Sequence, residues 1–376
     1  MKNRFYFGLL FGLRHLIHAR YQFLFFIVVP FFLFLFFIAL FYDGIPYNLP
    51  IGVVDHDHSK LSRSFIQSID ATQTLKVAYK LESVDEAQKL LKKGKIYAFV
   101  RIEQGLQKRS IVRDTPSVAF YINTQYILIG KAVHAALLKA YMATSLKMEA
   151  LLKLRKSPSL TLGSDLFPMT FSVIALFNTD QNYGYFLLFA LLPSLWQIIV
   201  IVGSVIVIGE ILKAKKTAYL LRRNPLGFIV GVLAPYSVVF LFYGLFFIFY
   251  LYGPLGHSFA GSFWLLLLAL FLTMVAYEAV ALLFLSVTKD YARSLSLGAV
   301  FAAPAFAFVG ITFPSLGMNH FALLWRALLP ITHYLQIQIA QAHYGSSFFD
   351  VAEEYYALAT FIPLFFVAVW ILWRRR

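Results

Sequence analysis

Six long apolar runs dominate the chain, and one long polar stretch separates the first run from the second. The runs cover residues 21–42, 184–209, 227–252, 263–287, 295–314 and 356–373. A hydrocarbon core about 30 Å thick takes roughly 20 mostly apolar residues as a helix, so each run is long enough to cross it. The pattern therefore predicts a polytopic α-helical membrane protein with six transmembrane helices.

The polar stretch between the first two runs, residues 43–183, has the pattern of an inserted α/β domain. Short runs of β-branched and aromatic residues predict four strands, at 51–55, 75–81, 96–102 and 117–123. Ser59 is the predicted N-cap of the first helix, and Ser83 with Glu86 three residues later forms a capping box for the second. A long helical pattern over 127–156 then leads the chain toward the second apolar run.

One polar cluster in this domain, Asp55, His56, Asp57 and His58, has two interpretations. Carboxylate and imidazole groups are suitable metal ligands, but adjacent residues rarely converge on one ion. Asx-type turns before a helix capped by Ser59 account for both aspartates. The chain contains no cysteine, which excludes disulfides and thiolate metal sites. We therefore expect no metal site, and no arrangement of nucleophile and base indicates a catalytic one.

Charge sets the expected orientation. The chain is 60% hydrophobic with a mean hydropathy of +0.72, so we attribute its formal net charge of +15 to the positive-inside rule and expect no nucleic-acid partner. Both termini are then cytoplasmic, and the 43–183 domain is extracytoplasmic. The first span, 21–42, is predicted to be a retained anchor because it is longer than a signal-peptide core and lacks a small-x-small site. The basic residues behind this expectation are Lys2, Arg4, Arg14, Arg20, Lys213, Lys215, Lys216, Arg222, Arg223, Lys289, Arg293 and Arg374 to Arg376.

Two segments on the expected cytoplasmic side have more pattern than a connector needs. Residues 1–20 alternate apolar and basic positions, which predicts either an amphipathic helix in the membrane interface or a simple basic flank. Residues 210–226 mix apolar anchors with five basic residues. They are too charged to span and too apolar for a plain loop, so they indicate a surface helix that touches a cytoplasmic partner.

Three sets of residues carry a resemblance to a known family. The first is a cytoplasmic Glu210, Thr217, Leu221 and Pro225, with Lys216 where the family has glycine. The second covers Ser286, Ala292, Pro304, 310–314 (GITFP), Met318, Trp325, Leu329, Pro330 and 332–334; the third is 52–55 with Asp57 and Ser59. In order and spacing, over essentially the whole chain, they resemble the permease subunits of ABC-2 type exporters that carry one large extracytoplasmic domain after the first span.

The resemblance implies a permease that is not itself an enzyme and holds no cofactor, while separate ABC ATPase subunits bind and hydrolyse ATP. The chain agrees, because it has no G-x-x-x-x-G-K-[ST] loop. Two permease copies, identical or paralogous, are implied, in the cytoplasmic (inner) membrane of a bacterium. The implied ATPase-coupling residues are Glu210, Thr217, Leu220, Leu221 and Pro225. The implied residues of the translocation path or gate, mainly on the second and fifth spans, are Pro193, Glu278, Pro304, Gly310, Phe313 and Pro314.

Two further features concern the membrane-embedded part. Glu278 is the only acidic residue well inside an apolar run, where a charge costs about 2.5–3.5 kcal/mol; it either lines the path or pairs with another helix.

Residues 315–355 include a stretch long enough to cross, but Arg326, Pro330 and His333 make insertion costly. We expect a re-entrant pair of short helices there, broken at Pro330, that caps the exit at 310–314.

The cargo is open on sequence alone. Aromatic-rich spans fit an apolar or amphipathic solute, drug-like or lipid-like, and a large extracytoplasmic domain fits docking to a periplasmic adaptor. Two other classes compete with the exporter. A secondary transporter would need ionisable sites in the membrane and usually shows internal repeats, and a membrane receptor with an extracytoplasmic sensor domain would need a cytoplasmic output.

Overall fold

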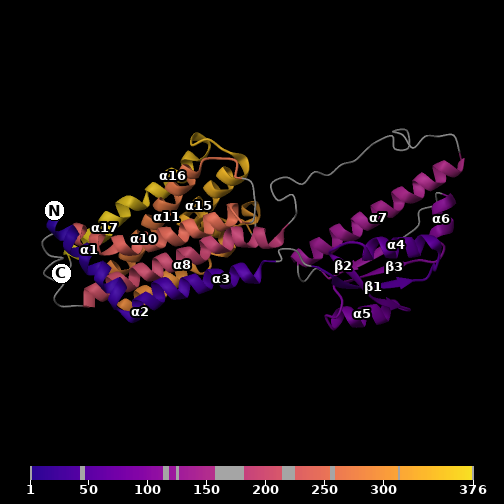
Figure 1. The fold of residues 1–376 in the computed structure, drawn as a ribbon, viewed down its shortest axis with the longest axis horizontal. Helices are drawn as coiled ribbons and strands as arrows, with labels where there is room; N and C mark the ends of the chain where they lie inside the picture. Colours follow the sequence, from indigo (N-terminus) through magenta and orange to yellow (C-terminus); the bar gives the residue numbers. More distant parts are fainter. Residues whose placement is uncertain are drawn as a thin grey trace. The chain divides into compact units, whose positions relative to one another are not determined.

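The computed structural model describes residues 2–42, 47–112, 118–123, 127–156, 182–213, 225–254, 259–311 and 314–374. The chain divides into two compact units (Figure 1). The helical unit is Met1–Tyr42 with Leu176–Arg376, and the inserted domain is Asp43–Ala175. Each is described by itself.

Among the described residues of the helical unit, six helices are long and apolar enough to cross a membrane, as predicted. They are Arg20–Leu40, Tyr183–Leu212, Pro225–Tyr252, Phe263–Thr288, Tyr291–Phe308 and Phe349–Arg374. The first span contains α2 (Arg20–Phe23), a π-helical turn (Leu24–Val28) and α3 (Val29–Leu40). The second, third and fourth spans are α8 (Tyr183–Lys213), α10 (Pro225–Tyr252) and α11 (Phe263–Thr288). The fifth span contains α12 (Tyr291–Ala302) and α13 (Ala305–Phe308), and the sixth contains α16 (Ala352–Ala359) and α17 (Phe361–Arg374).

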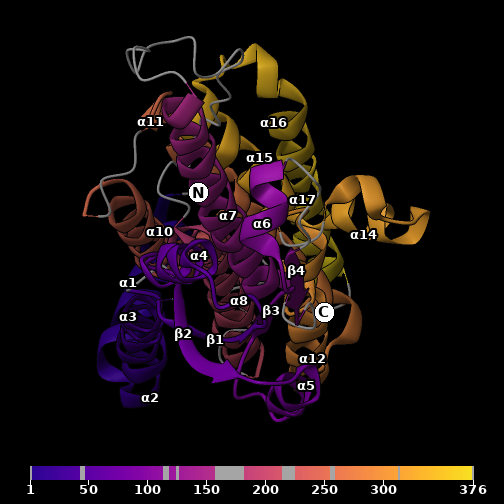
Figure 2. The same ribbon diagram turned by 90° about the vertical axis from the view of Figure 1, so that its right-hand side faces the viewer.

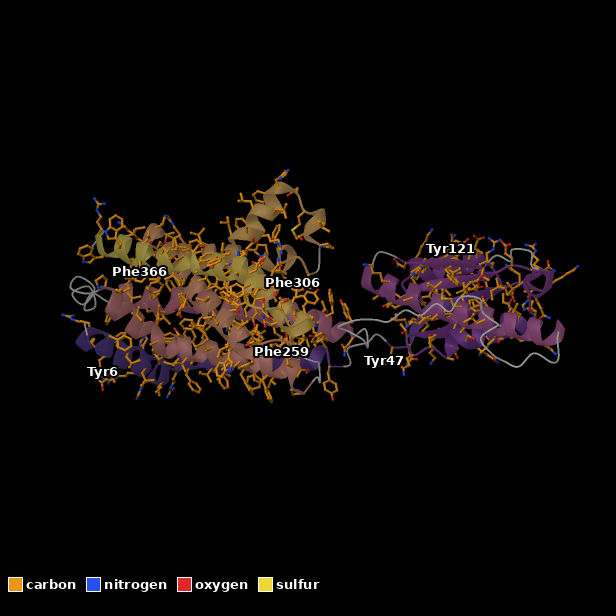
Figure 3. The ribbon with its side chains drawn as sticks, turned by 90° about the horizontal axis from the view of Figure 1, so that it is seen from above. Tyr6, Tyr47, Tyr121, Phe259, Phe306 and Phe366 are labelled. Atoms are coloured by element: carbon orange, nitrogen blue, oxygen red, sulfur yellow. The ribbon has the colours of Figure 1, made fainter. Side chains whose placement is uncertain are left out.

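The second and fourth spans form the centre of the helical unit. In the apolar window of each span, 72% of α8 and 67% of α11 is buried, against 17% of the first span and 22% of the fifth. Trp196 and Tyr277 are among the largest side chains without any exposed surface. The peripheral spans instead present aromatic side chains outward; Phe32 of the first span is 63% exposed, and Phe366 of the sixth, labelled in Figure 3, is 51% exposed. This distribution suits helices that face lipid.

A short turn joins the fourth span to the fifth. Lys289 ends α11 in the left-handed conformation with φ of 54°. Asp290 then caps α12, because its Oδ1 accepts the Arg293 N–H at 2.7 Å. The fifth span is broken at Pro304, which cannot donate a backbone hydrogen bond. Its helical part therefore covers Tyr291–Phe308, somewhat before the apolar run at 295–314.

Residues Lys2–His18 form helix α1, which packs along α10. The two backbones approach closely because both helices have glycine at the crossing. A Cβ on Gly231 would lie 2.3 Å from the Phe5 carbonyl oxygen, and one on Gly12 would lie 2.5 Å from the Val232 oxygen. Small residues at a crossing permit this approach in membranes. We call the end of the helical unit that holds α1 the α1 end; Figure 1 places both chain termini there.

Residues 315–348, all of which are described, contain short helices and no candidate span; the sixth span begins at Phe349, within the 315–355 segment. Its main helices are α14 (His320–Leu328) and α15 (Pro330–Ile339). The break falls at Pro330, where the sequence predicts it, because the residue before proline is pushed into an extended conformation, here Leu329 with φ −92° and ψ 114°. No residue of α14 is buried, and Figure 2 shows α14 at the edge of the unit, whereas α15 is largely buried.

The inserted domain is a small α/β sheet, as predicted. Its strands are β1 (Leu49–Asp55), β2 (Leu75–Leu81), β3 (Ala98–Ile102) and β4 (Val118–Ile122), in the order β2-β1-β3-β4. The first three are parallel and β4 is antiparallel. Helices α4 (Lys60–Asp70), α6 (Leu106–Val112) and α7 (Ile127–Lys156) pack on one face, and α5 (Val84–Lys92) packs on the other.

The Asp55–Ser59 turn is built from the domain's own side chains. Asp55 Oδ1 accepts the N–H groups of Asp57 and His58 at 3.0 and 3.1 Å. Asp57 accepts from Gly105 N–H at 2.8 Å. Ser59 caps α4 by accepting the Ser62 N–H at 3.1 Å. Both aspartates therefore serve turn and cap geometry, the second of the two interpretations of this cluster.

Candidate functional site

The carboxylate of Glu210 gathers three polar side chains at the α1 end. His15 Nε2 lies 3.0 Å from Glu210 Oε2. Tyr21 donates its hydroxyl to the same oxygen at 2.8 Å, and Gln22 donates Nε2–H at 2.6 Å. Tyr236 in turn donates its hydroxyl to Gln22 Oε1. We call these five residues the Glu210 cluster; it joins α1, α2, α8 and α10.

The position of Glu210 explains why it needs these donors. Glu210 lies in the last turn of α8, where the helix dipole disfavours a negative charge. The donors from α1 and α2 compensate, and the Glu210 side chain is only 24% exposed. A fifth helix, α12, packs beside the cluster. Its Tyr291 ring can approach α8 because Gly209 has no side chain, and a Cβ there would lie 2.4 Å from the ring. The carboxylate thus ties the N-terminal helices to the second span.

The other predicted coupling residues follow directly along the chain. The helix of the second span continues through Glu210 to Lys213, because Ile211 and Leu212 extend its apolar pattern beyond the expected end at 209. Pro225 is the first residue of α10, a position that suits proline. Thr217, Leu220 and Leu221 lie outside the described residues.

Glu278 is buried in α11 and accepts a hydrogen bond from another span. The hydroxyl of Ser237, in α10, donates to Glu278 Oε1 at 2.6 Å. The same hydroxyl lies 3.1 Å from the Leu233 carbonyl oxygen. Glu278 thus forms a hydrogen bond between two spans, α10 and α11.

Pro193 and Pro304 are brought near each other by one side chain. Gln197, one turn after Pro193 in α8, donates Nε2–H to the Ala302 carbonyl at 3.1 Å, just before Pro304. Ser194 donates its hydroxyl to Ala190 O at 2.7 Å. Neighbouring side chains thus contact backbone carbonyls close in sequence to both prolines.

The end of the fifth span turns at Gly310, whose φ of +89° favours glycine. The absence of a side chain at Gly310 also leaves room for the Arg326 side chain of α14, since a Cβ there would lie 3.4 Å from Arg326 Nε. Pro314 precedes the short 3₁₀ helix Ser315–Gly317. Phe313 lies outside the described residues. The predicted exit elements at Gly310 and the 315–355 segment are therefore in contact.

A family model described as "ABC-2 family transporter protein" matches residues 21–371. The chain belongs to this family. No curated protein and no solved structure matches the chain.

As an ABC-2 family transporter protein, the chain is the membrane subunit of an ABC-type transporter. Subunits of this kind are generally not catalytic, and the family implies association with ABC ATPase subunits. The match covers the first span from its second residue, all of the next four spans and nearly all of the sixth, but it begins after α1. His15 of the Glu210 cluster therefore lies outside the matched region.

The sequence of this ABC-2 protein did not predict the partners of its site residues. His15, Tyr21 and Gln22 were not assigned to Glu210, and Gln197 was not assigned to the Pro304 break. A signal exists for two of them. Gln22 and Gln197 are amides inside apolar runs, where a polar side chain needs a specific partner.

Proposed function

We propose that the chain forms the translocation path of an ABC exporter, paired with a second permease copy and two separate ATPase subunits. ATP is bound and hydrolysed on those partners. The cargo is an apolar or amphipathic molecule, drug-like or lipid-like. The observation that carries the proposal is the Glu210 cluster, because it attaches α1, α2 and α10 to the segment that begins the family's coupling motif.

The fifth span supports pairing with a second copy, identical or paralogous. Its exposed residues include a row of small side chains along α12, namely Ala292, Ser296, Ala299 and Ala303. Small residues let membrane helices approach closely. Only 22% of the apolar window of this span is buried within the chain, which leaves that face for a partner permease or lipid.

The proposed orientation places the α1 end in the cytoplasm of a bacterium and the inserted domain outside the inner membrane. The basic residues near the α1 end support this. On the far side, the inserted domain is the element that would dock a periplasmic adaptor.

Cysteine labelling tests this orientation, since the chain has no cysteine of its own. Lys92 is exposed on α5. We expect Lys92→Cys to react with a membrane-impermeant maleimide in cells with only the outer membrane permeabilised, and Lys216→Cys to react only after the inner membrane is opened. Labelling of Lys216→Cys under the first condition, with Lys92→Cys protected, would reverse the orientation and remove the coupling segment from the ATPase.

Substitution in the coupling segment tests the function itself. A carboxylate at Leu220 or Leu221 would oppose an apolar contact with the ATPase, so we expect Leu220→Asp and Leu221→Asp to lower co-purification of the ATPase at least tenfold. The permease should still insert. The exposed Lys92→Gln in the inserted domain is the control. A normal complex with undiminished transport in both variants would refute the assignment of this segment.

A further inference from the structure

Three hydrogen bonds in series run through the centre of the helical unit. Ile331 N–H donates to the Tyr277 hydroxyl oxygen at 3.2 Å. Tyr277 donates that hydroxyl to Gln197 Oε1. Gln197 then donates Nε2–H to the Ala302 carbonyl at 3.1 Å. All donors point the same way along the series, which strengthens such a chain of bonds in a low-dielectric interior.

Each end of the series lies at a proline break. Ile331 follows Pro330 at the start of α15, and Ala302 ends α12 two residues before Pro304. Helix ends leave backbone N–H and carbonyl groups without partners. The series supplies a partner for one such group at each break. Ile331, Tyr277 and Gln197 have no exposed surface, so water cannot replace these bonds while the helices stay in place.

Other polar groups on α15 oppose this arrangement. Thr332 Oγ1, the Tyr334 hydroxyl and Gln338 Oε1 are buried with no hydrogen-bond partner among the described residues. A buried polar atom without a partner is costly, because it has lost water and gained nothing in return. A shift of α15 that brought water to these atoms would relieve that cost. The bond from Ile331 to Tyr277 therefore holds α15 in a position in which these three polar atoms stay buried without partners.

We propose that Gln197 and Tyr277 form a latch that holds α15 on α8 and α11 and links its position to the broken end of α12. Both are positioning residues: a shift of α8 relative to α12 breaks the bond between Gln197 and Ala302 and frees Tyr277 to release α15. The buried polar groups of α15 then become accessible to water. The idea rests on the proposed function only in that α15 borders the exit of the path.

The test uses the purified chain alone, without ATPase or nucleotide. Thr332→Cys introduces the only thiol, at a side chain that is 1% exposed. Its rate of reaction with a water-soluble maleimide reports access of water to the start of α15, beside the bond from Ile331. We expect slow labelling with Tyr277 present and labelling roughly tenfold faster with Tyr277→Phe, the ratio expected for the loss of one buried hydrogen bond.

Matched variants separate the latch from general loosening. Tyr355→Phe removes another tyrosine bond to α11, from the hydroxyl to Leu265 O at 2.7 Å, and should leave the rate unchanged. Gln197→Met should accelerate labelling as Tyr277→Phe does, and the double variant should add nothing, because both break one series. If Tyr277→Phe does not fold, Gln197→Met carries the comparison.

Two results would overturn the latch. One is a labelling rate that neither Tyr277→Phe nor Gln197→Met changes, and the other is fast labelling of Thr332→Cys with Gln197 and Tyr277 both present. Because no ATPase takes part, a failure of the exporter assignment would leave the labelling result unchanged. The two proposals therefore fail separately.

Discussion

Replacement of Glu210 by alanine is expected to abolish coupling between the permease and its ATPase. The substitution leaves the donors of His15, Tyr21 and Gln22 without their shared acceptor. A buried donor that is left without an acceptor costs about 1–3 kcal/mol, and each of these three donors costs less because the site is partly exposed. We expect ATP-driven activity of the reconstituted complex to fall at least tenfold while the chain still inserts.

Glu210→Gln is the matched control, because it keeps an oxygen acceptor for Tyr21 and Gln22 but removes the charge opposite His15. It should retain more activity than Glu210→Ala. Lys92→Gln is a second control, since this residue is exposed on α5 of the inserted domain and lies outside the cluster. Wild-type activity in Glu210→Ala would show that the cluster has no part in coupling.

Replacement of Gly231 by leucine is expected to displace α1 from α10. A Cβ at this position would lie 2.3 Å from the Phe5 carbonyl oxygen, and that atom belongs to the backbone of α1. Overpacking of this kind costs about 1–3 kcal/mol. Hydrogen exchange should therefore accelerate across α1, and the Glu210 cluster should lose His15.

Gly298→Ala provides the comparison for this experiment. Its nearest contact would be Ile201 at 3.6 Å, an ordinary van der Waals distance. The exchange rate of α1 should not change in this variant. Protection of α1 that is equal in Gly231→Leu and Gly298→Ala would mean that the glycine crossing does not hold α1 in place.

Local patterns predicted the elements of this chain well, because each depends on neighbouring residues. The six spans follow from apolar runs, and the break between α14 and α15 follows from Pro330. The site depends instead on residues that are distant in sequence: Glu210 meets His15 only when α1 packs on α10, and Tyr277 meets Ile331 only when α15 folds back onto α11. Tertiary packing decides such pairs, and a single sequence does not contain their distances.

The end of the second span predicted from charge differs from the structure. The basic residues after Glu210 indicate a separate surface helix, yet α8 continues through Glu210 to Lys213. The reason is that polar partners from α1 and α2 compensate the carboxylate at the end of the span. A charged residue at the end of an apolar run therefore does not mark the end of the helix when a neighbouring helix supplies its hydrogen-bond partners.

The mass of the intact complex tests the central claim most directly. The tagged chain would be purified in mild detergent from its own host and measured by native mass spectrometry. The exporter account predicts two permease copies, identical or paralogous, with two copies of an ATPase that carries the G-x-x-x-x-G-K-[ST] loop missing from this chain. A chain that purifies without any ATPase, and whose transport continues in cells lacking ABC ATPases, would contradict it.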